Sequence, residues 1–140
     1  MNRRSFGLSA MIVSSMLTGC NDDETSLLSF TDVSAPGWLD VRLTGAPGNT
    51  EALLFEVVGG PIDSVASASH RVFTNPRAPD QLRVLLVGNL QNNVVAKVWV
   101  PNPLAVSRYQ IVLEQAASGQ GFQQQSVLNY SLKLEAPARR

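Results

Sequence analysis

The sequence predicts an all-β protein, an antiparallel β-sandwich with about seven to nine strands. From residue 38 onward, apolar and polar residues alternate in short segments, which is the spacing of a strand with one buried face. Glycine, proline and asparagine separate these segments at short intervals. No stretch of this region repeats its apolar residues with the helical period, so helices have little sequence to occupy.

The first half of this region contains two well-marked strands and two weaker segments. Residues 38–44 and 52–58 alternate clearly and should each bury one face. Residues 62–68 are small and polar, which fits an irregular strand or a loop. Residues 71–74 form a short candidate strand that Asn75-Pro76 is expected to end. The residues expected in the core are Leu39, Val41, Leu43, Leu53, Phe55 and Val57.

The second half begins with two apolar strands joined by a polar link. Residues 81–87 carry apolar side chains on both faces, which is typical of a central strand. Residues 88–93 link this strand to residues 94–100, which Pro101 and Pro103 should end. The residues of this second strand that share a face are Val94, Ala96, Val98 and Val100.

Two further alternating segments complete the predicted sandwich. Residues 109–114 form one strand, and the last strand has its apolar residues at Leu128, Tyr130, Leu132 and Leu134. Between them, residues 115–125 are rich in Gln, Ser and Gly. We expect a long, mobile hairpin loop there.

The first twenty residues have the organisation of a signal peptide. Arg3 and Arg4 provide a basic start, and residues 6–17 provide an apolar run of suitable length. This run is too short for a membrane-spanning helix, which needs roughly 20 apolar residues. It leads into Leu17-Thr18-Gly19-Cys20, which resembles the lipobox of bacterial lipoprotein precursors. The resemblance implies a lipid thioether on Cys20 and cleavage just before it.

This resemblance sets the expected domain organisation and location. Residues 1–19 would be a signal peptide, residues 20–36 a lipid-anchored tether reaching up to roughly 50 Å, and residues 37–136 the sandwich. Residues 2–8 also resemble the twin-arginine motif, so the export route stays open. The expected location is the bacterial cell envelope, with the protein held by its lipid on the periplasmic face of the inner or outer membrane.

Composition argues against several function classes. Removing 19 of the 140 residues leaves 121, enough for one domain with a core. Nine basic and eleven acidic residues then remain, a slightly negative balance that argues against a nucleic-acid partner. His70 is the only histidine and Cys20 the only cysteine, so we expect no metal, cofactor or disulfide.

Two parts of the sequence resemble known sandwich domains. Residues 82–87 followed by 93–100 resemble the middle of cohesin-like domains, where an apolar strand leads through a polar turn into another. Residues 104–109 resemble the approach to the tyrosine corner of immunoglobulin-like domains, with Tyr109 at the start of a late strand. The whole precursor is similar to small bacterial lipoproteins with one such domain. These resemblances imply a fold rather than a ligand.

Trp38 and Trp99 are the main candidates for a recognition surface. Both are expected on the outward face of their strands, together with Arg42 and Lys97. These residues could stack on sugars or contact a protein partner. Two other interpretations stay open: apolar residues of the tether could cover the indoles, or the strand register could be shifted by one residue. Phe122 is another candidate contact, with plain disorder of its loop as the alternative.

Catalytic patterns are weak. His70 lies beside Ser67 and Ser69, but this spacing alone does not bring the side chains together, and no Gly-x-Ser-x-Gly motif is present. Paired carboxylates could cleave glycosides, and Asp63 and Asp80 with loop carbonyls could bind calcium. Each of these acids is expected beside a turn or on a solvent-facing side, and no dense Asp/Asn/Gly loop repeat supports a calcium site. The candidate carboxylates are Asp40, Glu51, Glu56, Asp63 and Asp80.

Two classes of function remain. We expect a non-catalytic, lipid-anchored binding or structural module whose partner is an envelope protein or a glycan. The alternative is a small envelope hydrolase, or an accessory subunit of an envelope enzyme, whose carboxylates converge only in the folded chain. A concave pocket lined by two of these acids would favour the enzyme, and a flat face bearing both tryptophans would favour binding.

Overall fold

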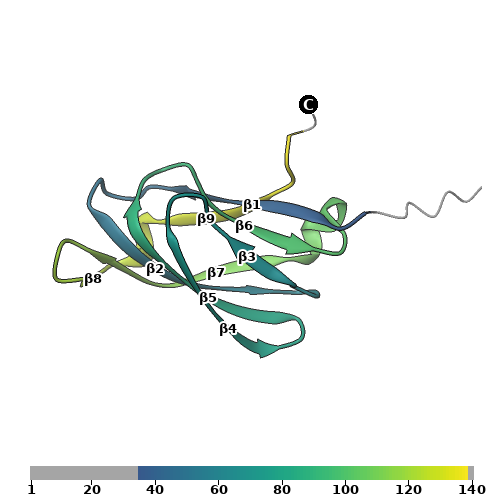
Figure 1. Ribbon diagram of the computed structural model, residues 1–140. Coiled ribbons are helices and arrows are strands. Elements are labelled where there is room, and N and C mark those ends of the chain that lie inside the picture. The colour runs from purple at the N-terminus through teal and green to yellow at the C-terminus, as the bar shows by residue number, and fades with distance from the viewer. Residues whose placement is uncertain (1–34, 139–140) are drawn as a thin grey trace, which may run out of the picture. The chain divides into compact units, whose positions relative to one another are not determined.

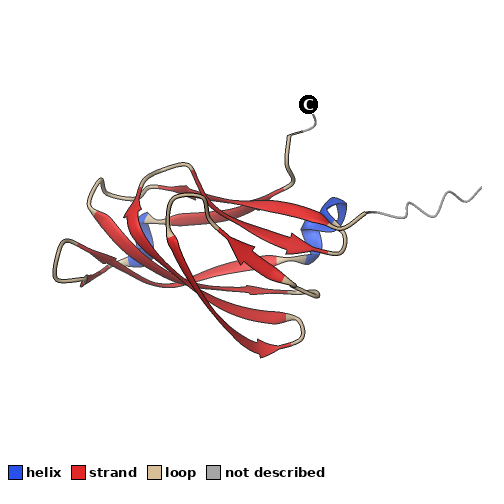
Figure 2. Cartoon of the chain, in the orientation of Figure 1, coloured by secondary structure: helices blue, strands red, loops and turns tan. Residues whose placement is uncertain are grey.

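The structure, a computed structural model, describes residues 35–138, which form a sandwich of two antiparallel β-sheets with nine strands (Figures 1 and 2). In spatial order, the four-stranded sheet contains β3 (Ser64–Ala66), β6 (Val94–Val100), β1 (Gly37–Thr44) and β9 (Ser131–Glu135). The five-stranded sheet contains β4 (Arg71–Ala78), β5 (Gln81–Leu90), β2 (Thr50–Val58), β7 (Gln110–Ser118) and β8 (Gln123–Gln125). The predicted fold class is confirmed. The predicted signal peptide, Cys20 and tether residues 20–34 lie outside the described residues.

Two short 3₁₀ helices accompany the strands: η2 (Pro103–Arg108) before β7 and η3 (Val127–Asn129) before β9. The side chain of Asn102 accepts hydrogen bonds from the first backbone N–H groups of η2, which fixes where the chain turns after Pro101. Within residues 35–138, neither helix is long and apolar enough to cross a membrane.

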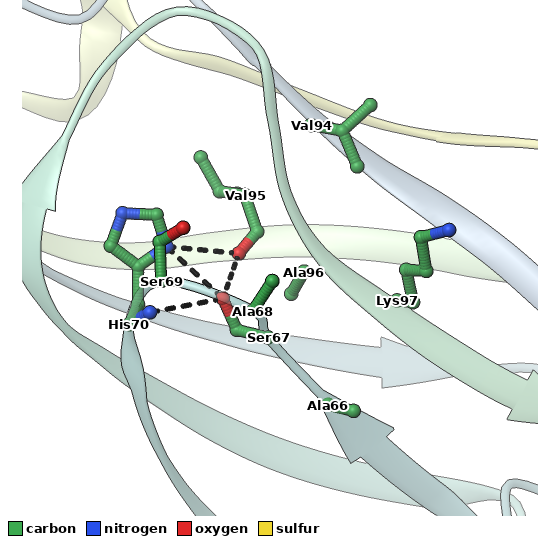
Figure 3. A pocket seen from close by; sticks show the side chains of 9 residues that line it. All are labelled: Ala66, Ser67, Ala68, Ser69, His70, Val94, Val95, Ala96 and Lys97. Atoms are coloured by element: carbon green, nitrogen blue, oxygen red, sulfur yellow. Dashed lines mark hydrogen bonds between the residues drawn. The ribbon is translucent and has the colours of Figure 1, made fainter.

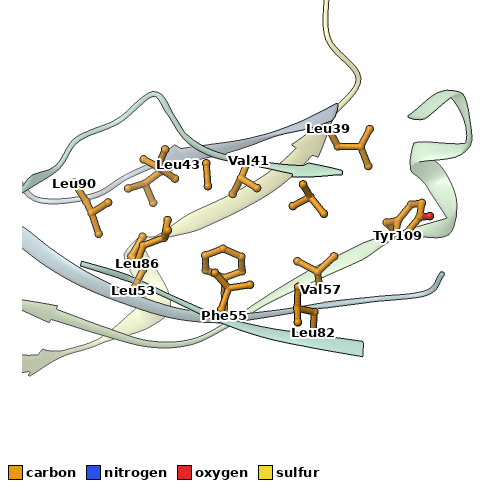
Figure 4. Close-up of a cluster of buried hydrophobic side chains, with 14 of the residues drawn as sticks. Leu39, Val41, Leu43, Leu53, Phe55, Val57, Leu82, Leu86, Leu90 and Tyr109 are labelled. Carbon is orange, nitrogen blue, oxygen red and sulfur yellow. The ribbon is translucent and has the colours of Figure 1, made fainter. Parts of the chain in front are cut away.

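The core lies between the two sheets and follows from the alternation in the sequence (Figure 4). All six residues that β1 and β2 were expected to bury are fully enclosed. In β5, Leu82, Val84 and Leu86 join them, and β5 lies between β4 and β2, as expected of a central strand. The inward face of each strand is therefore the face that the period of two predicts.

One core residue of β6 differs from the prediction. Val41 pairs with Ala96 and Arg42 with Val94, so Val95 is an extra residue in β6. This bulge turns Val95 into the core, where it is 3% exposed, and leaves Val94 half-buried. The prediction that Val94 shares a face with Ala96, Val98 and Val100 was wrong because a bulge interrupts the alternation.

β4 does not end at Asn75-Pro76, as the sequence suggested, but continues to Ala78. It is an edge strand that pairs only with β5, so the backbone groups along its other side have no partner strand. A proline, which has no N–H, can therefore be accommodated there without the loss of a hydrogen bond between strands. β5 is also longer than predicted and runs to Leu90, which is fully buried. The expected link of residues 88–93 is therefore reduced to the short turn 91–93.

The Gln-rich segment is mostly strand rather than a long mobile loop. β7 extends to Ser118 and β8 begins at Gln123, so the turn between them covers only residues 119–122. Ala116 and Ser118 are small enough to be buried, while neighbouring glutamines face solvent at the sheet edge. Polar residues thus fit a hairpin at the edge of a sheet, where the outer face of the strands and the backbone along the free edge are both exposed to solvent.

The last strand starts later than predicted. Leu128 lies in η3 and is 90% exposed, and β9 begins only at Ser131. The Ser126 hydroxyl accepts a hydrogen bond from the N–H of Leu128 at the start of this turn, which interrupts the period of two. Tyr130, just before β9, is buried, and its hydroxyl lies 3.0 Å from the Thr50 hydroxyl.

Tyr109 links the two sheets at the end of η2. Its hydroxyl donates to the carbonyl oxygen of Pro61 at 3.0 Å, and its ring packs on Gly60. Pro61 lies in the connection by which the chain passes from β2 to β3, that is, from one sheet to the other. A tyrosine corner would reach an acceptor a few residues upstream, whereas this acceptor lies 48 residues away in sequence.

Tyr109→Phe is expected to lower the free energy of unfolding by about 1 kcal/mol, because the carbonyl of Pro61 loses its donor. Burial raises the pKa of Tyr109, with a smaller raising effect from Asp63 and a lowering effect from Arg108. The stability that comes from the neutral phenol is complete below about pH 10 and is lost as the pH rises through the raised pKa. Urea titrations should therefore show a smaller alkaline loss of stability in the variant than in the natural protein.

Candidate functional site

The two tryptophans predicted for a recognition surface lie side by side. Trp38 in β1 and Trp99 in β6 are direct cross-strand partners on the outer face of the four-stranded sheet. Their ring centroids are 4.9 Å apart and their planes meet at 68°, an edge-to-face arrangement. Both rings are half-buried, and the register is the one that the alternation predicts. A shift of one residue, one of the two other interpretations, is therefore excluded.

The two predicted cations lie on the same face, each beside a carboxylate. Arg42 Nε donates to Glu135 Oε2 at 2.8 Å, and this hydrogen bond, together with the charge of Glu135, raises the pKa of Arg42. Lys97 Nζ lies 3.7 Å from Asp40 Oδ1. Ion pairs this exposed add little to stability. They leave the face close to neutral beside an apolar aromatic pair.

Asp40 Oδ1 is buried and accepts no hydrogen bond among the described residues, because Lys97 Nζ, at 3.7 Å, stays beyond hydrogen-bond distance. Asp40 and Trp38 project from the same side of β1, two residues apart. The Asp40 side chain is 21% exposed although Oδ1 itself is buried, so the face combines indole surface with a partly accessible carboxylate, the two kinds of group that contact apolar and hydroxyl parts of a ligand.

Phe122 does not join this surface. It lies in the turn between β7 and β8, on the other sheet, and is 52% exposed. Its φ angle is +48°, a left-handed conformation that is uncommon for a bulky residue. There it lines a hollow of about 240 Å³ over Ala52, Leu54 and Ala117. The structure thus separates the five predicted surface residues into four on one sheet and one on the other.

Ser67 and His70 meet in space, contrary to the expectation from their spacing (Figure 3). The Ser67 hydroxyl lies 3.1 Å from His70 Nδ1 and donates to the carbonyl oxygen of Val95 at 2.7 Å. It also accepts the backbone N–H of His70, so a tight turn after β3 brings the two residues together. His70 Nε2 lies 3.1 Å from the carbonyl oxygen of Asn89.

This cluster borders a shallow hollow of about 340 Å³ between the β3–β4 connection and the first half of β6. The hollow is mainly apolar, and the charged residue in its lining is Lys97. A hydrolase would need the serine proton to pass to the histidine and donors for the developing oxyanion. Here the short hydrogen bond of Ser67 goes to a backbone carbonyl, which indicates a structural role for the hydroxyl.

The candidate carboxylates do not converge in the hollows that the structure describes. Of four well-defined hollows among residues 35–138, one contains a candidate acid, Asp63, and that hollow holds about 190 Å³. Within the same residues, no three histidine, cysteine, aspartate or glutamate side chains gather to hold a metal ion. The glycosidase and calcium hypotheses thus gain no geometric support.

Fold and surface together define a small β-sandwich domain of two antiparallel sheets that carries a half-buried aromatic pair on its outer face. Comparisons of the chain with protein families, with curated proteins and with solved structures found no match.

Proposed function

We propose that this protein is a non-catalytic, lipid-anchored component of the bacterial cell envelope. In this proposal its sandwich, of immunoglobulin-like or cohesin-like type, binds an envelope protein or a glycan through the outer face of the four-stranded sheet. The observation that carries the binding role is the Trp38–Trp99 pair beside Asp40 and Lys97. The lipobox-like residues before Cys20 support the anchor.

The geometry of the pair limits which ligand would fit. Two indoles at 68° do not form one flat platform, so a ligand would stack on one ring and contact the edge of the other. A sugar ring could lie on the indole while its hydroxyl groups reach Asp40 or Lys97. A protein partner would insert an apolar side chain in the same place, and such contacts are often centred on tryptophan.

Cys20→Ala is expected to abolish lipidation and to leave the precursor uncleaved or mislocated. The test is to produce the full precursor and the variant in a bacterial host, fractionate the cells and measure the mass of the mature N-terminus. A diacylated Cys20 in the membrane fraction supports the anchor. A soluble product with an unmodified Cys20 would refute it, and the search for partners would move to secreted or cytoplasmic proteins.

The double variant Trp38→Ala, Trp99→Ala is expected to weaken binding through the proposed surface by about 2 kcal/mol or more, as for buried aromatic anchors. The measurement is co-sedimentation of the protein with purified peptidoglycan sacculi, followed by cross-linking to proteins in intact cells. Leu128→Ala is the matched control, because Leu128 is 90% exposed and lies in η3, away from this surface. Equal binding by all three proteins would remove the tryptophans from the recognition surface.

The second candidate function, a small envelope hydrolase, is favoured by one observation. Ser67 and His70 lie within hydrogen-bond distance beside a hollow, and the Asn89 carbonyl could hold the proton on His70 Nε2. The test is hydrolysis of a short-chain p-nitrophenyl ester by the natural protein, Ser67→Ala and His70→Ala. Turnover that requires both residues would favour the hydrolase. We expect the three proteins to match the buffer rate.

A further inference from the structure

The hollow beside Ser67 and His70 adjoins the tryptophan surface along β6. Lys97 lines this hollow of about 340 Å³ (Figure 3) and, two residues from Trp99 in the same strand, projects from the same outer face. The neighbouring strand β3 follows the same order, because Ser64 pairs with Trp99, and Ala66, which also lines the hollow, pairs with Lys97. The indoles and the start of the hollow are therefore one step of two residues apart, about 6.6 Å along the strand.

The walls of the hollow are small and apolar. They include Ala66, Ala68 and Val94. The hollow forms because β3 ends at Ala66, so the first half of β6 has no partner strand on that side. Its volume is at the lower end of the roughly 300–1,000 Å³ of small-molecule sites, and it is shallow. These dimensions suit one apolar substituent of a larger ligand, such as the methyl group of an acyl substituent.

Lys97 lies between the two apolar parts and is accessible to an anion. Its side chain is 54% exposed, and Nζ lies 3.7 Å from Asp40 Oδ1, beyond hydrogen-bond distance. The two ion pairs of this face cancel in charge. Lys133, which projects from the same face as the partner of Arg42, forms no ion pair among residues 35–138. The face therefore has a small positive excess, which favours a ligand with negative charge.

This arrangement suits a glycan better than a protein partner. A protein hot spot is a well-packed and fully desolvated cluster, whereas here the charged pair of Lys97 and Asp40 separates the indoles from the hollow. A protein surface laid over both apolar parts would remove this pair from water, which costs free energy, and would leave Asp40 Oδ1 without a donor. An oligosaccharide presents apolar ring faces and polar groups in turn, so it can contact both apolar parts while the pair stays solvated.

We propose that this surface binds an acidic glycan that carries acyl substituents. This inference rests on the binding role proposed above and adds the chemical class of the ligand. One sugar ring stacks on an indole of the Trp38–Trp99 pair, and a carboxylate of the glycan accepts a hydrogen bond from Lys97. The methyl group of an acyl substituent enters the hollow beside Ala66. Ring, carboxylate and acyl group thus meet the indoles, the ammonium group and the hollow in the order in which β6 presents them.

Tryptophan fluorescence reports on this surface directly, because Trp38 and Trp99 are the two tryptophans of the chain. The full chain, produced in a bacterial host and kept in detergent, is titrated with oligosaccharides of equal length. Hyaluronan fragments carry carboxylates and acyl groups, chitin fragments acyl groups alone, pectate fragments carboxylates alone, and cellulose fragments neither. Hyaluronan fragments are expected to bind at least about tenfold more tightly than each of the others, the effect of one hydrogen bond to a charged group or of one well-filled apolar site.

Two variants separate the contributions of charge and hollow. Lys97→Gln should lower the affinity for hyaluronan fragments about tenfold and leave the affinity for chitin fragments unchanged, because it removes the cation alone. Ala66→Leu should fill the hollow and remove the preference for acylated over unacylated chains. Arg77→Gln is the matched control, since it removes the same charge from an exposed position in β4, on the other sheet, and should change neither affinity.

Equal affinity for hyaluronan fragments and for pectate or chitin fragments would overturn the proposal, as would equal effects of Lys97→Gln and Arg77→Gln. A lack of response to all four kinds of chain would overturn it as well. If cross-linking to an envelope protein still required Trp38 and Trp99 in that case, the binding role proposed above would stand with a protein as the partner. Failure of the ligand class is therefore distinguishable from failure of the surface.

Discussion

Gly59→Ala is expected to lower the free energy of unfolding by more than about 3 kcal/mol, a large part of the roughly 5–15 kcal/mol that stabilises a typical domain. Gly59 directly follows β2 and has a φ angle of +114°, which an alanine adopts only with strain. An added Cβ atom would lie 1.9 Å from the carbonyl oxygen of Arg108 and 3.3 Å from Cα of Tyr109. Because those atoms belong to the backbone just before β7, the neighbouring strands β2 and β7 would have to separate at this end to accept it.

A series of glycine variants separates strain from overlap in urea titrations. Gly119 has a φ angle of +73° but nothing within 4 Å of an added Cβ, so Gly119→Ala should cost about 1 kcal/mol from strain alone. Gly48 has neither feature, and Gly48→Ala should change stability by less than about 0.5 kcal/mol. If Gly59→Ala cost no more than Gly119→Ala, close packing of Gly59 against η2 would not be a determinant of the fold.

The alternation of apolar residues predicted the sheets well because it reports directly on which side of a strand is buried. It placed Leu39 and Phe55 in the core correctly. It failed where the backbone departs from a regular strand. Val95 is buried through a bulge, and Leu128 is exposed because η3 interrupts the last alternating segment. Bulges and short turns depend on pairing with distant strands, which no local pattern contains.

The same reasoning explains what could be predicted of the candidate surfaces. Trp38 and Trp99 were placed on the outer face by alternation alone, but their direct pairing depends on the β1–β6 register. The contact between Ser67 and His70 was missed because it depends on a three-residue turn held by the Val95 carbonyl. The length of β4 was missed because Asn75-Pro76 suggested that the strand ends there, whereas an edge strand accommodates proline.

Phe55→Ala is expected to cost about 3–5 kcal/mol of stability and to leave much of the protein unfolded at moderate urea concentrations. Phe55 is fully buried in β2, between Val84 of β5 and Leu113 of β7. Removing its ring would leave a cavity between strands that pair on both sides and cannot close around it. Chemical denaturation followed by circular dichroism measures the loss.

Phe73→Ala is the matched control, since it removes the same side chain from an edge strand where the ring is 55% exposed. Its cost in the dilute protein should be about 1 kcal/mol or less. A loss from Phe73→Ala as large as the loss from Phe55→Ala would contradict the argument that burial between the two sheets sets the cost of losing the ring.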